Sequence, residues 1–331
     1  MNFGLLARNI SGHLIQSRVS PVSRAATVLT VGLAVLGVLV SIDTRFTLAS
    51  LPNVMPLLVV IVALDGASRL VPYARIAETL QTVLYGVLYL AVTVLCAILA
   101  AYAMQRFAFP LRDDLFARVD TTLGFNWLSY AHWVDGHLPV QRLFRFAYGT
   151  IQIQIVLPLV LLALFNRPGE VRIYLLAFAI ALSATIVISA LLPAAGPIAF
   201  VDRASFQFLK FTGATPLDHL MRLREAGPFV LHEMPGGIAT FPSFHSTVAI
   251  LTPLSLRGHR RIFACMLVLD ALMLGGTITE GAHYFCDVLA GIAMAFFAYF
   301  SARAVIRRED ALGADDRERL TARSGLSGTA N

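Results

Sequence analysis

The sequence has few charged side chains. Asp, Glu, Lys and Arg make up 14% of its 331 residues, whereas a soluble domain usually carries about a quarter. Hydrophobic residues make up 57% of the chain, and the mean hydropathy is +0.72. This shortage of charge excludes an ordinary soluble domain and predicts a protein that is embedded in a lipid bilayer.

Cysteine is also scarce. Cys96, Cys265 and Cys286 lie in or beside apolar segments and lack the spacing of metal ligands. The sequence therefore predicts neither a disulfide framework nor a zinc site. Acidic residues form no cluster around the polar motifs described below, so we expect no metal requirement and no other cofactor. The sequence also has no internal repeat.

Apolar runs of membrane-spanning character fill most of the chain. A hydrocarbon core of roughly 30 Å needs about 20 apolar residues per helix. The runs cover about 25–42, 51–64, 79–104, 147–165, 171–192, 247–256, 262–279 and 287–306. The first run is longer than the 7–15 apolar residues of a usual signal peptide, so a retained helix is favoured. We therefore predict an all-α integral membrane protein with about eight transmembrane helices.

Two polar segments, 105–146 and 198–241, interrupt the apolar pattern. In the first, charged residues alternate with aromatic residues such as Phe116, Trp127 and Trp133. This mixture suits the bilayer–water interface, where amphipathic rings settle. An ordinary loop with a small aromatic core explains it equally well, and both interpretations stay open.

The basic residues predict the orientation in the membrane. With eight spans, sixteen of the 26 Lys and Arg residues fall on the side of the two termini. The positive-inside rule places that side in the cytoplasm. Both long polar segments then face the extracytoplasmic side of the cell (inner) membrane, and the basic excess requires no nucleic-acid partner. We expect a two-helix segment at 1–78, a membrane domain at 79–308 and a polar cytoplasmic tail at 309–331.

Two short motifs carry the candidate chemistry. The first is Phe-Pro-Ser-Phe-His-Ser at 241–246, and the second is Gly-Ala-His-Tyr-Phe-Cys-Asp at 281–287. Two apolar segments lie between them, separated by the basic turn 257–261. An out-and-back pair of helices returns the second motif to the face where the first begins. The sequence thus predicts that two histidines and an aspartate meet at one membrane surface.

These residue types suit nucleophilic catalysis. His283 and Asp287 are four residues apart, so that on a helix start the carboxylate orients the imidazole. His245 is then available as general acid and base. Ser243, Ser246 and the backbone amides of a helix N-terminus suit an anionic oxygen. Each feature alone has a plain structural explanation; their conjunction in a chain poor in polar residues favours phosphoryl transfer through a phosphohistidine.

At these residues the chain resembles the phosphatidic acid phosphatase type 2 superfamily of membrane enzymes. Pro242-Ser243-Phe244-His245 matches the family motif Pro-Ser-Gly-His, and His283 with Asp287 matches its His-x3-Asp motif. The resemblance covers roughly 148–308. It implies a six-helix core, here with two extra N-terminal helices, and it implies His283 as nucleophile, Asp287 as its orienting partner and His245 as the acid and base.

Departures from the family pattern are informative. Phe244 replaces the motif glycine, Thr277 stands where the third motif has arginine, and 191–197 lacks the cations of the first motif. Similar departures occur in the inositol phosphorylceramide synthase-like branch, which includes headgroup transferases. Phosphoryl transfer still requires positive charge at the equatorial oxygens. The candidates are Arg203, Lys210, Arg222 and Arg224, with Arg203 the first choice; a solvated loop cation is the alternative for each.

The depth of the motifs predicts the kind of substrate. The segment from Pro242 to Leu256 spans roughly 22 Å as a helix, which is shorter than the hydrocarbon core. His245 is thus expected at or slightly below the headgroup level, where a phospholipid or polyprenyl phosphate reaches it laterally. Asp270 lies about 20 Å from His283 along a helix, so an interhelical hydrogen bond is expected for it. A non-catalytic lipid-binding protein or a transporter is the rival interpretation.

Overall fold

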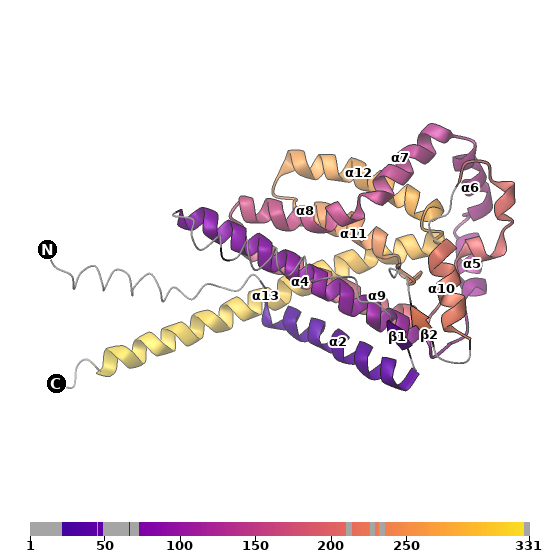
Figure 1. Ribbon diagram of the computed structural model, residues 1–331. Coiled ribbons are helices and arrows are strands. Elements are labelled where there is room, and N and C mark those ends of the chain that lie inside the picture. Colours follow the sequence, from indigo (N-terminus) through magenta and orange to yellow (C-terminus); the bar gives the residue numbers. More distant parts are fainter. Residues whose placement is uncertain are drawn as a thin grey trace.

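The computed structural model describes residues 22–44, 46–48, 66, 73–209, 214–225, 229–231 and 236–327. Within these ranges the chain is almost entirely helical (Figure 1). The longer helices are α2 (Arg24–Thr44), α4 (Ala74–Gln105), α8 (Ile151–Leu164), α9 (Pro168–Leu191), α11 (Phe244–Ser255), α12 (Arg260–Thr279) and α13 (Phe285–Ser327). Shorter elements are α5 (Asp113–Thr122), α6 (Trp127–Asp135), α7 (Leu138–Gly149), η1 (Pro197–Phe200), η2 (Arg203–Ser205) and α10 (Ala214–Leu223).

The predicted all-α membrane fold is confirmed. Among the described residues, α4, α9, α12 and the part of α13 up to Ala314 are long and apolar enough to cross a membrane. The pair α7–α8 makes a fifth span if its 52° bend is taken as one broken helix, and α2 is a shorter apolar helix. The predicted run at 51–64 lies outside the described residues. In the described ranges, one pair of parallel three-residue strands, β1 (Phe46–Leu48) and β2 (Phe229–Leu231), is the exception to the helical pattern.

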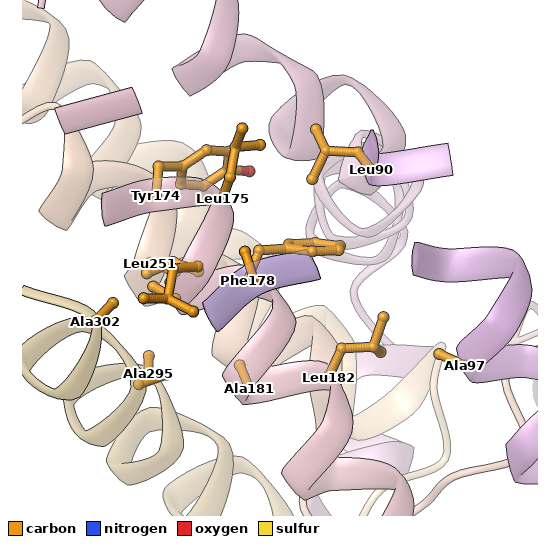
Figure 2. Packing of buried hydrophobic residues seen from close by; sticks show 14 of the residues in the cluster. Leu90, Ala97, Tyr174, Leu175, Phe178, Ala181, Leu182, Leu251, Ala295 and Ala302 are labelled. Carbon is orange, nitrogen blue, oxygen red and sulfur yellow. The ribbon is translucent and has the colours of Figure 1, made fainter. Parts of the chain in front are cut away.

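Helix α9 forms the centre of the bundle. It packs against α13, α4, α11, α8 and α2. In its most apolar 18-residue stretch, 72% is buried inside the protein, whereas the value for the corresponding stretch of α4 is 28%. A helix that is apolar on all sides buries every face when neighbours surround it. Figure 2 shows Tyr174, Phe178 and Leu182 of this helix between residues of α4, α11 and α13. The core of the protein therefore lies around α9.

The last helix is longer than predicted. The sequence pattern ends it near Arg308, but α13 continues to Ser327. The extension has no proline, its glycines are Gly313 and Gly325, and its many Ala, Leu, Arg and Glu residues are good helix formers. Its start is also fixed to the bundle, because Arg172 of α9 pairs with Glu309 at 2.8 Å and with Asp310. A polar composition alone was not sufficient to end the helix.

The first polar segment folds into α5, α6 and α7, which gather with α10 at one end of the long helices (Figure 1). Phe116 stacks on Phe241 with ring centroids 4.6 Å apart, and the indole of Trp127 donates to the carbonyl of Ile278 at 3.0 Å. The interpretation as a small aromatic core is confirmed for these residues. Phe107 and Trp133 are about half exposed, at 48% and 49%.

Buried aspartates tie this end of the molecule together. Asp113 accepts hydrogen bonds from the backbone N–H groups of Ala195 (3.0 Å) and Gly196 (2.8 Å) and from the hydroxyl of Tyr284 (3.1 Å). Gly196 has φ +86°, and a side chain there would meet the carbonyl of Ala282 at 2.6 Å. Asp113 therefore holds the end of α9 against the segment that precedes α13.

Asp135 does the same for the second polar segment. Its carboxylate accepts from the backbone N–H groups of Gln207, Phe208 and Leu209 at 2.7–2.8 Å. Desolvation raises the pKa of Asp135, but the three N–H donors outweigh it and leave the pKa below its ordinary value. The carboxylate is thus the form that holds this loop in place.

Asp120 of α5 caps the N-terminus of α13 from a distance in sequence. Its two carboxylate oxygens accept from the N–H groups of Phe285 and Cys286, each at 2.8 Å. Helix N-termini leave such groups without intrahelical partners, and a carboxylate also suits the positive end of the helix dipole. The first turn of α13 is therefore fixed by a side chain about 165 residues earlier.

Asp120→Ala should lower the free energy of unfolding by about 1–2 kcal/mol, because a buried helix N-terminus loses its cap. The melting temperature of the purified protein in detergent measures this. Asp114→Ala on the same helix is the matched control, since the contact of Asp114 is an exposed ion pair with Arg118. Equal melting temperatures for the two variants would contradict the capping role.

Candidate active site

The two sequence motifs meet at the first turns of α11 and α13. The backbone N–H of Ser243 donates to the carbonyl of Asp287 at 3.1 Å. The hydroxyl of Thr247 lies 3.0 Å from the carbonyl oxygens of both Ser243 and Gly291. The prediction that the out-and-back pair α11–α12 returns the second motif to the first is confirmed.

Glycine at 291 permits this approach. A Cβ atom added there would lie 2.3 Å from the carbonyl oxygen of Ser243 and 2.8 Å from Cβ of Ser246. Real Cβ atoms do not come this close to backbone oxygen, so α11 and α13 contact each other where α13 has no side chain. The distance between the two motifs thus depends on Gly291.

His283 is held at both ring nitrogens. Its Nδ1 lies 3.2 Å from Asp287 Oδ2, and its Nε2 lies 3.5 Å from Ser243 Oγ. Asp287 Oδ2 also accepts from the backbone N–H of Tyr284 at 3.0 Å. His283 is 5% exposed and Asp287 is fully buried. A carboxylate at Nδ1 fixes the tautomer in which Nε2 carries the free lone pair.

His283 lies just before α13 rather than on it. The helix begins at Phe285, so the His-x3-Asp spacing bridges the connection and the first turn. Ala282, the preceding residue, has φ +53°. The predicted pairing of His283 with Asp287 nevertheless forms, because the bond of Asp287 to the N–H of Tyr284 folds the connection back on the helix start.

His245 lies in the first turn of α11. Its ring stacks on Tyr148 of α7, with centroids 4.0 Å apart and an angle of 10° between the planes. The hydroxyl of the same Tyr148 and Cδ2 of His283 both lie within about 3 Å of the Cβ position at Gly281, so Tyr148 connects the two imidazoles. The structure therefore brings together both histidines and the aspartate that the sequence singled out.

Two residues of α7, Arg145 and Tyr148, border the same site and were not among the sequence candidates. Arg145 Nε donates to Glu280 Oε2 at 3.2 Å. The Arg145 side chain is 42% exposed, whereas that of Glu280 is fully buried. Burial raises the pKa of Glu280, and the bond and charge of Arg145 oppose this. Arg145 therefore reaches toward the segment that leads to His283.

Tyr148 follows Arg145 by three residues and shares its face of α7. A Cβ atom at Gly281 would lie 3.0 Å from the Tyr148 hydroxyl and 2.6 Å from Cδ2 of His283. The hydroxyl and the imidazole thus converge on one glycine. The sequence offered no local signal for this pair, because only the fold brings α7 against Gly281.

The predicted phosphate-binding serines lie at the N-terminus of α11. Ser243 is the N-cap and accepts from the N–H of Ser246 at 3.4 Å. Both serines are fully buried, and the Ser246 hydroxyl has no hydrogen-bond partner among the described residues. Ser243 Oγ lies 3.5 Å from His283 Nε2. A phosphate-binding role for the two serines stays a prediction.

The predicted loop cations are placed differently from one another. Arg203 is exposed on η2, and Arg222 is exposed on α10. Arg224 donates to the carbonyls of Ala108 (3.3 Å) and Phe109 (2.6 Å), which joins α10 to the end of α4. Lys210 lies outside the described residues. A phosphate-binding role for any of these cations stays a prediction.

Asp270 is buried on α12, with 2% of its surface exposed. Gln154 of α8 is its polar neighbour. Neither carboxylate oxygen of Asp270 forms a hydrogen bond of ordinary geometry with the described residues. Asp270 of α12 and Gln154 of α8 therefore lie near each other, as expected for an interhelical contact, but the expected hydrogen bond does not form among the described residues.

Comparison with known proteins identifies the family. The sequence model of the PAP2 superfamily matches residues 114–301, which is more than half of the chain. The chain belongs to the PAP2 superfamily. The match contains both motifs, Asp120, Asp135 and the α7 residues, and it begins one residue after Asp113. No curated protein and no solved structure matched the chain.

Family membership sets the general chemistry. PAP2 superfamily members are phosphatases and phosphotransferases, so membership indicates a phosphatase-type activity on a lipid phosphate. No group of three or more His, Cys, Asp or Glu side chains in the described part of the chain is arranged to hold a metal ion. The expectation that the activity requires no metal ion stays a prediction.

Gly291→Ala should reduce activity by about a hundredfold or more, because the new methyl group must push Ser243 away from His283 and small displacements of reacting groups are costly. Gly149→Ala is the matched control, since no atom lies within 4 Å of a Cβ atom there. Turnover of a lipid phosphate by both purified variants provides the comparison. Normal activity of Gly291→Ala would show that the contact does not set the distance.

Proposed function

We propose that this protein is an integral membrane lipid phosphatase or phosphotransferase that acts on a lipid-linked phosphate through a phosphohistidine intermediate. The observation that carries the proposal is the arrangement of His283, with Nδ1 on Asp287 and Nε2 facing Ser243 at the N-terminus of α11. A nucleophile, its orienting carboxylate and an anion-binding helix end are the parts that this chemistry needs.

In the first step, Nε2 of His283 attacks phosphorus and the bond between phosphorus and the leaving oxygen breaks. Asp287 holds the Nδ1 proton and stabilises the positive charge that develops on the ring. His245 gives its proton to the leaving alcohol. The products of this step are the free alcohol and a phosphorylated His283.

In the second step, His245 removes a proton from water or from an acceptor hydroxyl, and that oxygen attacks phosphorus. The bond to Nε2 breaks and His283 is regenerated. Water as acceptor gives a phosphatase, and a lipid or alcohol hydroxyl gives a headgroup transferase. The resemblance of the motifs to the inositol phosphorylceramide synthase-like branch supports transfer.

The length of α11 supports a lipid substrate. The helix has twelve residues, which is about 18 Å at 1.5 Å per residue. A hydrocarbon core is roughly 30 Å thick. A helix this short, starting at the catalytic motif, supports a position for His245 near the level where lipid phosphates lie. The excess of basic residues on the side of the termini supports an extracytoplasmic site in the cell membrane.

We further propose Arg145 as a cation that neutralises the transferring phosphate. It is fixed by Glu280, lies one turn from Tyr148 and keeps 42% of its side chain exposed. Arg203 is the alternative from the polar loop, and it is exposed on η2. The family cations missing from 191–197 and from Thr277 leave this role to be filled.

His283→Ala should lower turnover by about a thousandfold or more, because the nucleophile is lost. The purified protein in nanodiscs is supplied with labelled anionic phospholipids and a polyprenyl phosphate, and free phosphate and new lipids are followed together. His137→Ala, an exposed histidine at the start of α7, is the control. Full activity of His283→Ala would refute the nucleophile. Free phosphate from wild type identifies a phosphatase, and a new headgroup-bearing lipid identifies a transferase.

Arg145→Gln should lower kcat/KM by about a hundredfold, as the loss of one charge-stabilising group does elsewhere. Arg142→Gln, an exposed arginine of the same helix, should be unaffected. Because Arg145→Gln also leaves Glu280 without its ion pair, the double variant with Glu280→Gln separates the two effects. Recovery of activity in the double variant would mean that Arg145 acts only on Glu280.

A further inference from the structure

A cavity lies at the end of the bundle opposite the candidate active site. It has a volume of about 160 Å³ and is lined by the α8–α9 turn and the α11–α12 turn. Helix α11 runs from Ser243 at the active site to Ser255 at this cavity, and α9 runs from the cavity to Leu191 in the other direction. The cavity is therefore a separate site, placed where the same helices end on the other face of the bundle.

Three nitrogen-bearing side chains line the cavity: Arg167, Arg257 and His259. Arg257 is fixed in place, with Nη1 donating to the carbonyl of Leu254 at 3.1 Å and its guanidinium 4.9 Å from the ring centre of Tyr299. His259 stacks on Phe165 with ring centroids 3.8 Å apart. Two of these groups are thus held in position before any ligand arrives, which reduces the entropy cost of binding.

Two helix N-termini meet at the same cavity. Arg167 is the N-cap residue of α9 and His259 is the N-cap residue of α12, and neither side chain caps its helix. Helices of 24 and 20 residues therefore point their positive ends toward the cavity lining. Together with the arginines, this arrangement favours an anionic group, and phosphate is the common one at such positions.

Glu170 adds a second requirement. It lines the cavity, with Oε1 3.6 Å from Arg257 Nη2. Its Oε2 is buried and has no hydrogen-bond partner in the part of the chain that the structure describes. A buried carboxylate oxygen is costly to leave without a donor. A ligand that fits this cavity therefore carries an anionic group and, close to it, an N–H or O–H donor.

We propose that the cavity binds the headgroup of a phospholipid in the leaflet opposite the active site. The phosphate lies against Arg167, His259 and the two helix ends, and an ammonium or hydroxyl group of the headgroup donates to Glu170. The position at the ends of apolar helices is the level of lipid headgroups. Leu162 forms an apolar part of the lining, and Leu164, two residues further along the chain, is 56% exposed and available to acyl chains.

Phosphatidylethanolamine and phosphatidylcholine with short chains are matched probes, because both carry a phosphodiester but only ethanolamine has N–H donors. Binding to the full-length protein, purified in detergent, depleted of lipid and carrying His283→Ala to prevent turnover, is measured by native mass spectrometry. We expect at least fivefold tighter binding of phosphatidylethanolamine. Arg167→Gln should weaken both lipids by about tenfold, the value of one charge-assisted hydrogen bond.

Glu170→Gln should remove the preference for ethanolamine while keeping the affinity for phosphatidylcholine. Arg118→Gln, an exposed arginine of α5, is the control and should bind as the parent does. Equal binding of the two lipids by the parent protein, or unchanged binding by Arg167→Gln, would overturn the proposal. Inorganic phosphate or glycerophosphoethanolamine binding as tightly as the lipid would assign the cavity to a soluble anion and overturn the lipid assignment.

Discussion

The contact between the first turns of α11 and α13 is the constraint on which the candidate site depends. At this point the two helices touch backbone to backbone, through Ser243, Asp287 and the side-chain-free position of Gly291. All three catalytic candidates lie within one turn of the contact. Their mutual distances are therefore set by main-chain packing, which is stiffer than the packing of long side chains.

Carboxylates outside the catalytic group support this contact. Asp113, Asp120 and Asp135 are buried, and each accepts at least two backbone N–H groups from a segment remote in sequence. In an apolar protein an unpaired N–H group is expensive, so a single carboxylate that satisfies two or three of them fixes a loop strongly. The polar segment 105–146 thus supplies structural anchors for the motifs as well as an aromatic core.

The sequence predicted the helices and the pairing of the motifs, because apolar length and the His-x3-Asp spacing are local features. It did not predict the roles of Asp113 and Asp120, since a carboxylate that binds remote backbone has no signature in its own neighbourhood. Arg145 and Tyr148 were missed for the same reason: only folding brings α7 against Gly281. The length of α13 was misjudged because charge was taken as the end of a helix, although Arg172 and helix propensity extend it.

The orientation of helix α13 about its own axis determines where Asp287 and Gly291 lie in the candidate active site. It begins beside His283 and continues without interruption to Glu309, where Arg172 and the N–H of Ala25 hold it. Turning this helix about its axis would carry Asp287 away from His283 and drive a side chain into Ser243 in place of Gly291. Because contacts hold the helix at both places, it cannot rotate about its axis without breaking them. The geometry of the candidate site thereby depends on ion pairs roughly 36 Å away along the helix.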